Sequence, residues 1–258
     1  AVRQRSLMSA RRTGTTAVNV RQARHPRQVT KVPAATAPPS LRSEQLADAP
    51  LVQLLLDEAT GTTATDSSGN GRDGTYSGTY TLQAAAIGSN GAASTAFAGG
   101  IVTVPDAAWM DVDSWTIEAL IYSTSTVYYR AWAMRDNGTE RLWIGMIEGG
   151  KPGDLGWNNS GGIFYNAAHA GSAFSLNTAY HVTTRWDSAS HKFEAFTNGV
   201  LQFAATTTGT AQTGARPLTV AGGSTGLAFA GRISHVAYYG VALSNARILA
   251  HAQVAGLA

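Results

Sequence analysis

Short apolar segments alternate with turn-forming residues from position 51 to the end of the chain. The first, residues 51–56, has strand length and lies between Pro50 and a polar, glycine-broken segment. Other strand-like segments follow at 101–104, 115–121, 141–147, 180–186, 192–196 and 218–220. Asn-Gly, the dipeptide that best supports tight hairpins, begins at positions 70, 90, 137 and 198. The pattern predicts an all-β fold, a two-sheet antiparallel sandwich of the jelly-roll type.

Two segments have helical features instead. Residues 244–252 place Ile248, Leu249 and Ala252 on one side, and Ser244 supplies an N-cap. Residues 40–48 are expected to form one helical turn before Pro50 closes the linker.

The charge is divided unevenly along the 258 residues. The first 42 residues carry nine basic side chains and no acidic one, a charge of +9, whereas residues 43–258 carry ten basic against sixteen acidic side chains, a charge of −6. Apolar residues in the first segment are too sparse for a core, and four prolines stiffen its second half. We therefore divide the chain into an extended basic arm with its linker, residues 1–48, and a jelly-roll domain, residues 49–258.

The basic arm is the candidate partner-binding segment. Its charge favours a partner that presents acidic or hydrogen-bonding grooves; the alternative is that the arm lies along its own acidic body. Nucleic acid is disfavoured as a partner, because the arm has no aromatic residue for stacking and the body would repel phosphate. The candidate contact residues are Arg3, Arg5, Arg11, Arg12, Arg21, Arg24, Arg27 and Lys31.

Several classes of site and segment are disfavoured by composition. Cysteine is absent, which excludes disulfides and cysteine-based metal sites. No run approaches the roughly eighteen apolar residues that a membrane span needs, and no apolar block follows the N-terminal arginines. Neither a membrane partner nor an export signal is therefore expected.

The loop DSSGNGRDG at residues 66–74 offers oxygen donors for a hard cation. Asp66 and Asp73 supply carboxylates and Asn70 an amide oxygen, a set that calcium could use. The same residue types also build loops by hydrogen bonding to their own backbone. Both a calcium site and a purely structural loop stay open, and no other cofactor is indicated.

Catalytic patterns are missing. Glycoside hydrolysis needs two carboxylates about 5 to 9 Å apart on one face, whereas Glu118 and Glu194 are each single acids within a strand. The phosphate-loop spelling at 145–151 is followed by Pro152, where a magnesium-binding hydroxyl should stand. His181 and His235 are interpreted as strand residues with satisfied hydrogen bonds. We expect no enzymatic activity.

Several segments resemble the laminin-G-like, concanavalin A-like family of jelly rolls, over most of residues 51–257. After the loop at 66–74, the similar segments are AFAGGIVTVP at 96–105, WTIEALI at 115–121, YHV at 180–182, FTNG at 196–199 and GRISHVAYYGVALS at 231–244. The order of the segments is that of the family, which implies the same sandwich fold. Leu120, Asn198 and Ser234 depart from the family pattern, so ligand roles at these positions are not carried over.

Sugar binding is an activity that this resemblance implies. Tyr128, Trp132 and Trp157 are the candidate residues, because aromatic rings stack on sugars. Trp157 lies among turn-forming residues, which predicts that it is exposed.

The alanine- and threonine-rich sequence also resembles the laminin-G-like domains of tailed-bacteriophage structural proteins. This resemblance implies a non-enzymatic virion protein, anchored to capsid or tail by the basic arm, whose head serves surface decoration or weak adhesion to host-surface glycan. The alternative is a secreted or cell-surface carbohydrate-binding module with a flexible linker. Self-association of the chain stays open.

Overall fold

A computed structural model describes residues 39–89, 91–125, 130–136, 141–148, 151–152, 157–158, 174–206, 214–223 and 228–258. In addition, no side chain is described in the strands at 141–148, 151–152 and 157–158 or at residues 130, 131, 134 and 136. The chain divides into two compact units, Ala1–Ala37 and Pro38–Ala258. The candidate contact residues of the basic arm, from Arg3 to Lys31, lie outside the described residues. We call the second unit the head.

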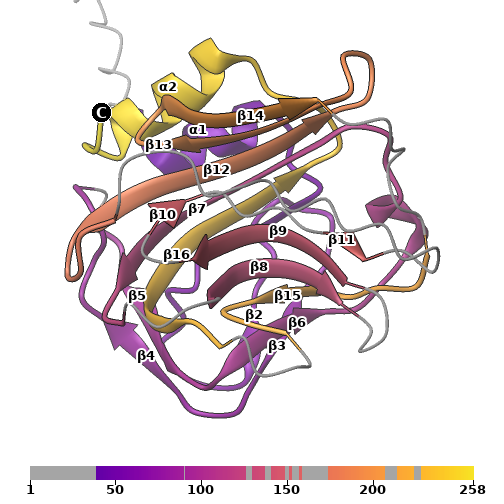
Figure 1. The fold of residues 1–258 in the computed structure, drawn as a ribbon. Coiled ribbons are helices and arrows are strands. Elements are labelled where there is room, and N and C mark those ends of the chain that lie inside the picture. The colour runs from indigo at the N-terminus through magenta and orange to yellow at the C-terminus, as the bar shows by residue number, and fades with distance from the viewer. Residues whose placement is uncertain are drawn as a thin grey trace, which may run out of the picture. The chain divides into compact units, whose positions relative to one another are not determined.

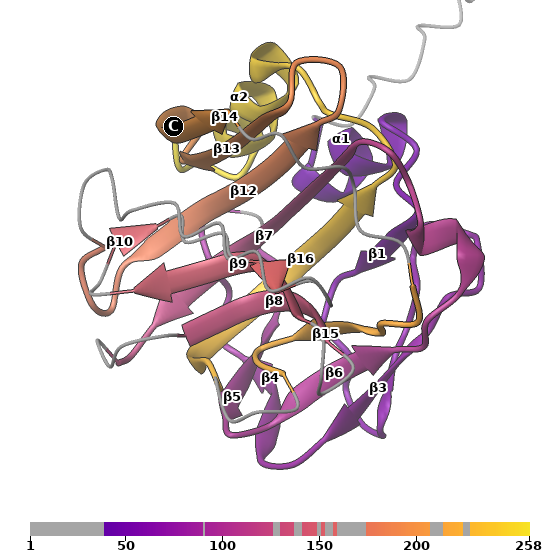
Figure 2. The ribbon, with the colours of Figure 1, turned by 45° about the vertical axis from the view of Figure 1, so that its right-hand side comes forward.

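The head is built from two antiparallel sheets that face each other (Figures 1 and 2). Sheet A has the strand order β14-β13-β12-β7-β16-β5-β4, and β1 also pairs with β16. Its strands are β1 (Val52–Leu54), β4 (Tyr80–Ala84), β5 (Ser94–Ala98), β7 (Trp115–Ser123), β12 (Ala179–Asp187), β13 (Lys192–Thr197), β14 (Val200–Thr206) and β16 (Ala230–Tyr239).

Sheet B has the order β10-β9-β8-β15-β6-β3-β2, and β11 also pairs with β9. Its strands are β2 (Thr63–Ala64), β3 (Gly74–Ser77), β6 (Ile101–Val104), β8 (Arg130–Asp136), β9 (Arg141–Glu148), β10 (Lys151–Pro152), β11 (Trp157–Asn158) and β15 (Leu218–Val220). The two-sheet antiparallel sandwich that the sequence predicts is confirmed.

The main core fills the space between the sheets. Alternate residues of each strand point inward, so that Ile117 and Trp186 of sheet A join Val102 and Val220 of sheet B in one buried cluster. Burying this cluster is the main favourable term in folding, since the described part has neither disulfide nor metal cluster to add to it.

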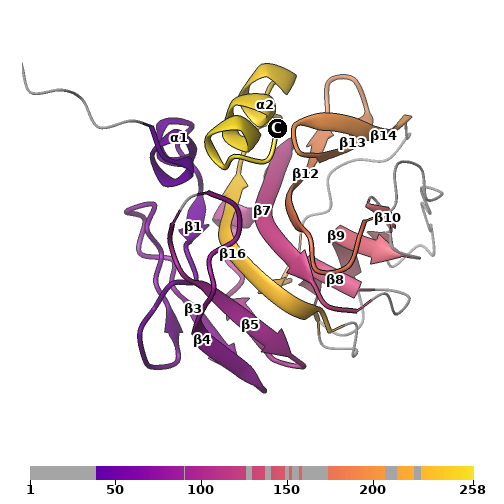
Figure 3. The same ribbon diagram turned by 90° about the vertical axis from the view of Figure 1, so that its left-hand side faces the viewer.

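A second layer covers the outer face of sheet A. Helix α1 (Leu41–Ala47) and helix α2 (Asn245–Val254) both lie on this side (Figure 3). Leu41 packs with Leu120 of β7, and Ile248 packs with Tyr239 of β16. Because both faces of sheet A are covered, nearly every residue of β7 is buried rather than every second one.

Both predicted helical segments are present, with Ser244 as the expected N-cap of α2, and the first segment forms a seven-residue helix where one turn was expected. Ser40 accepts a hydrogen bond from the backbone of Ser43, and Ser244 accepts one from the backbone of Arg247. Helix α1 packs against sheet A through Leu41 and Leu120 and belongs to the second unit, Pro38–Ala258. In the described residues no helix is long and apolar enough to cross a membrane.

Candidate functional site

One rim of the sandwich carries two hollows, one on either side of the short 3-10 helix η1 (Ala108–Met110). This helix belongs to the segment that leads from β6 of sheet B to β7 of sheet A. The smaller hollow has a volume of about 210 Å³ and is lined by Gly71, Arg72, Asp73, Val104, Pro105, Asp106, Ala107 and Trp109. The larger has a volume of about 610 Å³ and is lined by Asp111, Val112, Asp113, Ser114, Asp187, Gly240, Val241 and Ala242. We call this surface the rim site.

A buried arginine underlies the rim site. The side chain of Arg135 on β8 is only 2% exposed, and its Nη2 lies 3.0 Å from Asp106 Oδ1 and 3.2 Å from Asp111 Oδ1. Its Nε donates to the carbonyl oxygen of Arg216 and its Nη1 to that of Met110, and Nη2 also lies 3.3 Å from the carbonyl oxygen of Gly214. A buried guanidinium is costly unless its donors are satisfied, and here each nitrogen has a partner.

The two carboxylates that Arg135 holds belong to different hollows. Asp106 lines the smaller hollow and Asp111 the larger, and their side chains are 27% and 30% exposed. Both can therefore accept hydrogen bonds from a ligand while one cation fixes their positions. Trp109 lies between them in sequence, on η1.

The ring of Trp109 is half-buried and framed by two neighbours. The guanidinium carbon of Arg72 lies 4.1 Å from the ring centroid, and the ring of Tyr238 meets it edge-on at 6.4 Å. Arg72 is held in turn by a hydrogen bond of 2.6 Å from its Nη1 to the carbonyl oxygen of Leu51. The wall of the smaller hollow thus combines an aromatic ring, a guanidinium and a carboxylate.

The loop at 66–74 forms the other wall of this hollow and is held by its own hydrogen bonds. Asp66 accepts from the backbone N–H groups of Gln53, Ser68 and Arg72 and from the hydroxyl of Ser68. Burial acts to raise the pKa of Asp66, but these hydrogen bonds outweigh it and lower the pKa below its ordinary value.

The side chains expected to bind calcium in this loop make hydrogen bonds within the protein. Asp73 Oδ1 accepts from the backbone N–H of Asp66, and the amide nitrogen of Asn70 donates to the carbonyl oxygens of Pro50 and Leu51. In the part of the chain that the structure describes, no group of three or more acidic or histidine side chains could hold a metal ion. The arrangement supports the structural alternative.

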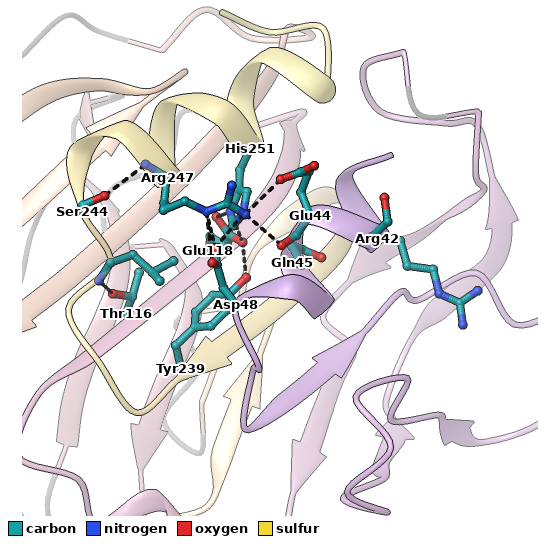
Figure 4. Close-up of polar contacts among 12 residues, drawn as sticks. Arg42, Glu44, Gln45, Asp48, Thr116, Glu118, Tyr239, Ser244, Arg247 and His251 are labelled. Carbon is teal, nitrogen blue, oxygen red and sulfur yellow. Dashed lines mark hydrogen bonds and ion pairs between the residues drawn. The ribbon is translucent and has the colours of Figure 1, made fainter. Parts of the chain in front are cut away.

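A separate polar cluster is buried between sheet A and the two helices (Figure 4). At its centre is Glu118 of β7, which is fully buried. Its carboxylate lies 3.0 Å from His181 Nε2, within 3.0 Å of His251 Nδ1, and 2.6 Å from the hydroxyl of Tyr239. His251 and Arg247 of α2 both pair with Asp48, which caps α1. We call this set the helix clamp.

Burial determines what the helix clamp can do. Glu118, His181 and His251 are each 0% exposed, so no substrate reaches them. Burial acts to raise the pKa of Glu118, but the two histidines outweigh it and lower the pKa far below its ordinary value. Glu118 is therefore an ionised structural carboxylate. His181 is a strand residue, as expected, but of its ring nitrogens only Nε2 is hydrogen-bonded, and its Nδ1 has no partner among the described residues.

The comparisons with known proteins agree with this architecture. The family model described as the concanavalin A-like lectin/glucanases superfamily matches residues 95–249. The chain belongs to this superfamily. Among curated proteins, no relative matches the sequence.

Solved structures share the superfamily fold. Domain 4 of AbnA, a GH43 extracellular arabinanase from Geobacillus stearothermophilus, solved in complex with arabinotriose, superposes with a TM-score of 0.62 at 19% identity, covering 78% of this chain and 97% of that domain. Trypanosoma rangeli sialidase, in complex with the inhibitor DANA, gives 0.54 at 12% identity, covering 77% of this chain but 32% of the sialidase. The binding domain of botulinum neurotoxin DC in complex with SialylT gives 0.56 at 12% identity, covering 81% of this chain and 52% of that one.

The three residues expected to bind sugar do not form one site among the described residues. Trp132 is 2% exposed and belongs to the main core, so it is not available to stack on a sugar ring. Tyr128 lies outside the described residues. Trp157 is in β11, where its backbone pairs with Leu142, and its side chain is not among those described.

Trp109, Arg135 and their two carboxylates are the functional candidates that sequence reasoning missed. A tryptophan flanked by Asp106 and Asp111 in a short segment between two strands was the available signal for the rim. Nothing in the sequence marks Arg135, because its partners lie 24 to 81 residues away.

Proposed function

We propose that the head is a non-catalytic glycan-binding domain that uses the rim site. The observation that carries this proposal is that one buried arginine holds Asp106 of the smaller hollow and Asp111 of the larger, with Trp109 in the lining of the smaller hollow. Carboxylates accept hydrogen bonds from sugar hydroxyls, and indole and guanidinium groups contact the faces of sugar rings. A preorganised set of this kind loses little entropy when a ligand binds.

The fold supports the same class of ligand. The arabinanase domain, covered over nearly its whole length, was solved with arabinotriose, and the neurotoxin domain with SialylT. At identities of 19% and 12% the likeness shows a shared fold. The ligand of this chain must therefore be inferred from the residues of its own rim site.

A non-catalytic role fits the way the principal carboxylates are used. Glu118 is enclosed by two histidines, Glu194 pairs with Arg185 at 2.6 Å, and Asp106 and Asp111 share Arg135. A glycosidase needs one carboxyl group that carries a proton to the leaving oxygen, and none of these four is placed away from a cationic or histidine partner.

Glycan-array binding with matched variants tests the rim site. We expect Trp109→Ala and Asp106→Asn each to reduce binding at least about tenfold, whereas Val200→Ala, an exposed apolar control at 59% exposure on β14, leaves it unchanged. Trp157→Ala tests the candidate that the sequence indicates. Loss of binding in Trp157→Ala with full binding in Trp109→Ala would move the site away from the rim.

We further propose that the basic arm anchors the head to a larger assembly, as a bacteriophage virion protein attached to capsid or tail. The charge of +9 on residues 1–42 against −6 on the remainder favours this separation of roles. A secreted or cell-surface carbohydrate-binding module remains the alternative, in which the arm is only a linker.

Deletion of residues 1–37 separates the two hypotheses, because it removes most of the charge and keeps α1 intact. If the arm anchors, the truncated head should no longer co-sediment with virion particles, and its glycan binding should be unchanged. Co-sedimentation that survives the deletion contradicts anchoring by the arm.

A further inference from the structure

The helix clamp contains a histidine that faces a carboxylate with each ring nitrogen. His251 Nδ1 lies 2.9 Å from Glu118 Oε1, and His251 Nε2 lies 3.0 Å from Asp48 Oδ2. The histidine is fully buried, while Asp48 is 16% exposed. Glu118 belongs to sheet A, whereas Asp48 is the C-cap of α1, so the imidazole bridges the sheet and the first helix (Figure 4).

Because each ring nitrogen faces a carboxylate, this geometry favours a proton on both ring nitrogens. A neutral imidazole has one N–H and one lone pair, so it can donate to only one of the two carboxylates. Its lone pair would then face the other carboxylate at about hydrogen-bond distance. The imidazolium form donates to both and offsets their negative charge in a buried site.

The remaining groups around His251 define how the clamp responds to pH. Arg247 Nη2 lies 3.2 Å from His251 Nε2 and also pairs with Glu44 at 2.9 Å. Tyr239 of β16 donates to Glu118 and its ring stacks on the imidazole, and His181 of β12 contacts the same carboxylate. Three carboxylates thus surround two cationic side chains when His251 is charged.

We propose that Asp48, His251 and Glu118 form a proton-dependent latch that fastens α1 to the head and loosens when His251 loses its proton. Loss of the proton removes the donor that Asp48 and Glu118 share, and Asp48 then keeps its pairing with Arg247 of α2 alone. Asp48 is the partly exposed member and belongs to α1, so the helix yields rather than the sheet. This latch goes beyond glycan binding and anchoring, neither of which requires it.

The direction of the response follows from the pKa of His251. Burial acts to lower the pKa of His251, but Glu118 and Asp48 outweigh it and raise the pKa above the ordinary value of 6.5. The latch is therefore fully closed below pH 6.5 and loosens as the pH rises through the raised value. Tyr239, whose pKa burial raises well above 10, does not titrate in the same range.

Other contacts of α1 persist when the latch loosens. Gln45 donates to the carbonyl oxygen of His235, Gln53 donates to Gln45, and Leu41 is fully buried. The response is consequently a more frequent local opening of residues 41–48, and not unfolding of the head.

Hydrogen exchange of the full chain tests the latch directly. Between pH 6 and 9, after correction for the intrinsic rate, we expect exchange of the α1 amides to rise by up to about tenfold for each unit by which the pKa of His251 is raised. Amides of β7 and β12 should keep their protection. An unchanged α1 rate, or a parallel rise in β7, would overturn the latch.

Variants separate the latch from general stability. In His251→Gln, which cannot carry the charge, α1 should exchange fast at every pH, and in His191→Asn, which replaces an exposed histidine outside the clamp, it should behave as in the wild type. If His251→Gln does not fold, Asp48→Asn serves the same purpose from the α1 side. Imidazole ¹⁵N spectra of the wild type give a readout that needs no variant, and a neutral His251 below pH 6.5 would contradict the latch.

Discussion

At the scale of single residues, the rim site depends on a side chain whose charge is out of place in a core. Arg135 stands on β8 three positions after Trp132, and both side chains are buried at 2% exposure. For Trp132 burial removes apolar surface from water, but for Arg135 it is tolerated only because two carboxylates and three carbonyl oxygens surround it. The arginine therefore links the stability of the rim to its shape.

Replacing Arg135 should expose this dependence. We expect Arg135→Met, which keeps most of the volume, to lower the free energy of unfolding by about 3 kcal/mol, because it leaves Asp106 and Asp111 without their cation. Arg232→Met is the matched control: Arg232 lies 3.9 Å over the ring of Tyr122 at the surface and should cost about 1 kcal/mol. Urea unfolding measures both, and a loss below about 1 kcal/mol in Arg135→Met would mean that the buried pair is not needed.

The loop at 66–74 gives a second prediction at this scale. Because the Asp66 oxygens already accept four hydrogen bonds, we expect no rise in melting temperature of the head at millimolar calcium. Asp66→Ala should lower the free energy of unfolding by about 2 kcal/mol, since three backbone N–H groups lose their acceptor. If millimolar calcium raised the melting temperature of the wild type by several degrees, and this rise were lost in Asp66→Ala, the loop would be a calcium site after all.

At the scale of elements, the sequence predicts where a tight turn forms but not which element packs against it. The Asn-Gly at 198–199 does form the expected tight turn, between β13 and β14, with φ of 51° at Asn198 and 78° at Gly199. The Asn-Gly at 70–71 instead lies inside the longer loop between β2 and β3. Only tertiary structure reveals that α2 packs on the 198–199 turn, because helix and hairpin are about fifty residues apart.

Because of this packing, we expect a substitution at Gly199 to destabilise the head more than the positive φ of the turn alone would. A Cβ added at Gly199 would lie 2.9 Å from Leu249 Cα, a backbone atom of α2. Gly71, with φ of 69° and open space around it, is the matched control. We expect Gly199→Ala to lower the free energy of unfolding by about 3 kcal/mol and Gly71→Ala by about 1 kcal/mol, as measured by thermal unfolding. Equal losses would show that α2 does not restrain the turn.

At the scale of the whole molecule, the sequence was sufficient for the fold and insufficient for the site. Segments such as 115–121 and 180–186 correspond to β7 and β12, because apolar residues at every second position identify a strand without reference to the rest of the chain. The residues of the rim come from four separate stretches of chain, and the helix clamp joins residues up to 203 positions apart. No local pattern records such a convergence, so Glu118 appeared as a solitary strand acid.

The acid response of the whole head follows from two buried groups. Burial lowers the pKa of His235 to about 4, so this histidine is neutral in the folded head and takes up a proton on unfolding as the pH falls below 6.5. Its contribution to stability is present above pH 6.5 and is lost progressively toward pH 4, and that of Glu118 is lost at still lower pH. We expect melting temperature to fall from pH 6.5 to 4 in the wild type and in His191→Asn, and to fall less in His235→Asn. Identical slopes in all three would contradict this assignment.

The most direct test of the rim site is to locate a bound saccharide on the head. Amide chemical shifts of the full chain, followed by NMR during titration with a saccharide that is positive on the array, would report every backbone position near the ligand. We expect the shifts to be confined to residues 71–73, 104–114, 187 and 240–242, the two hollows around η1. Shifts that cluster on β9 and β11 instead, or a wild-type chain that binds no saccharide of a broad array, would contradict a glycan site at the rim.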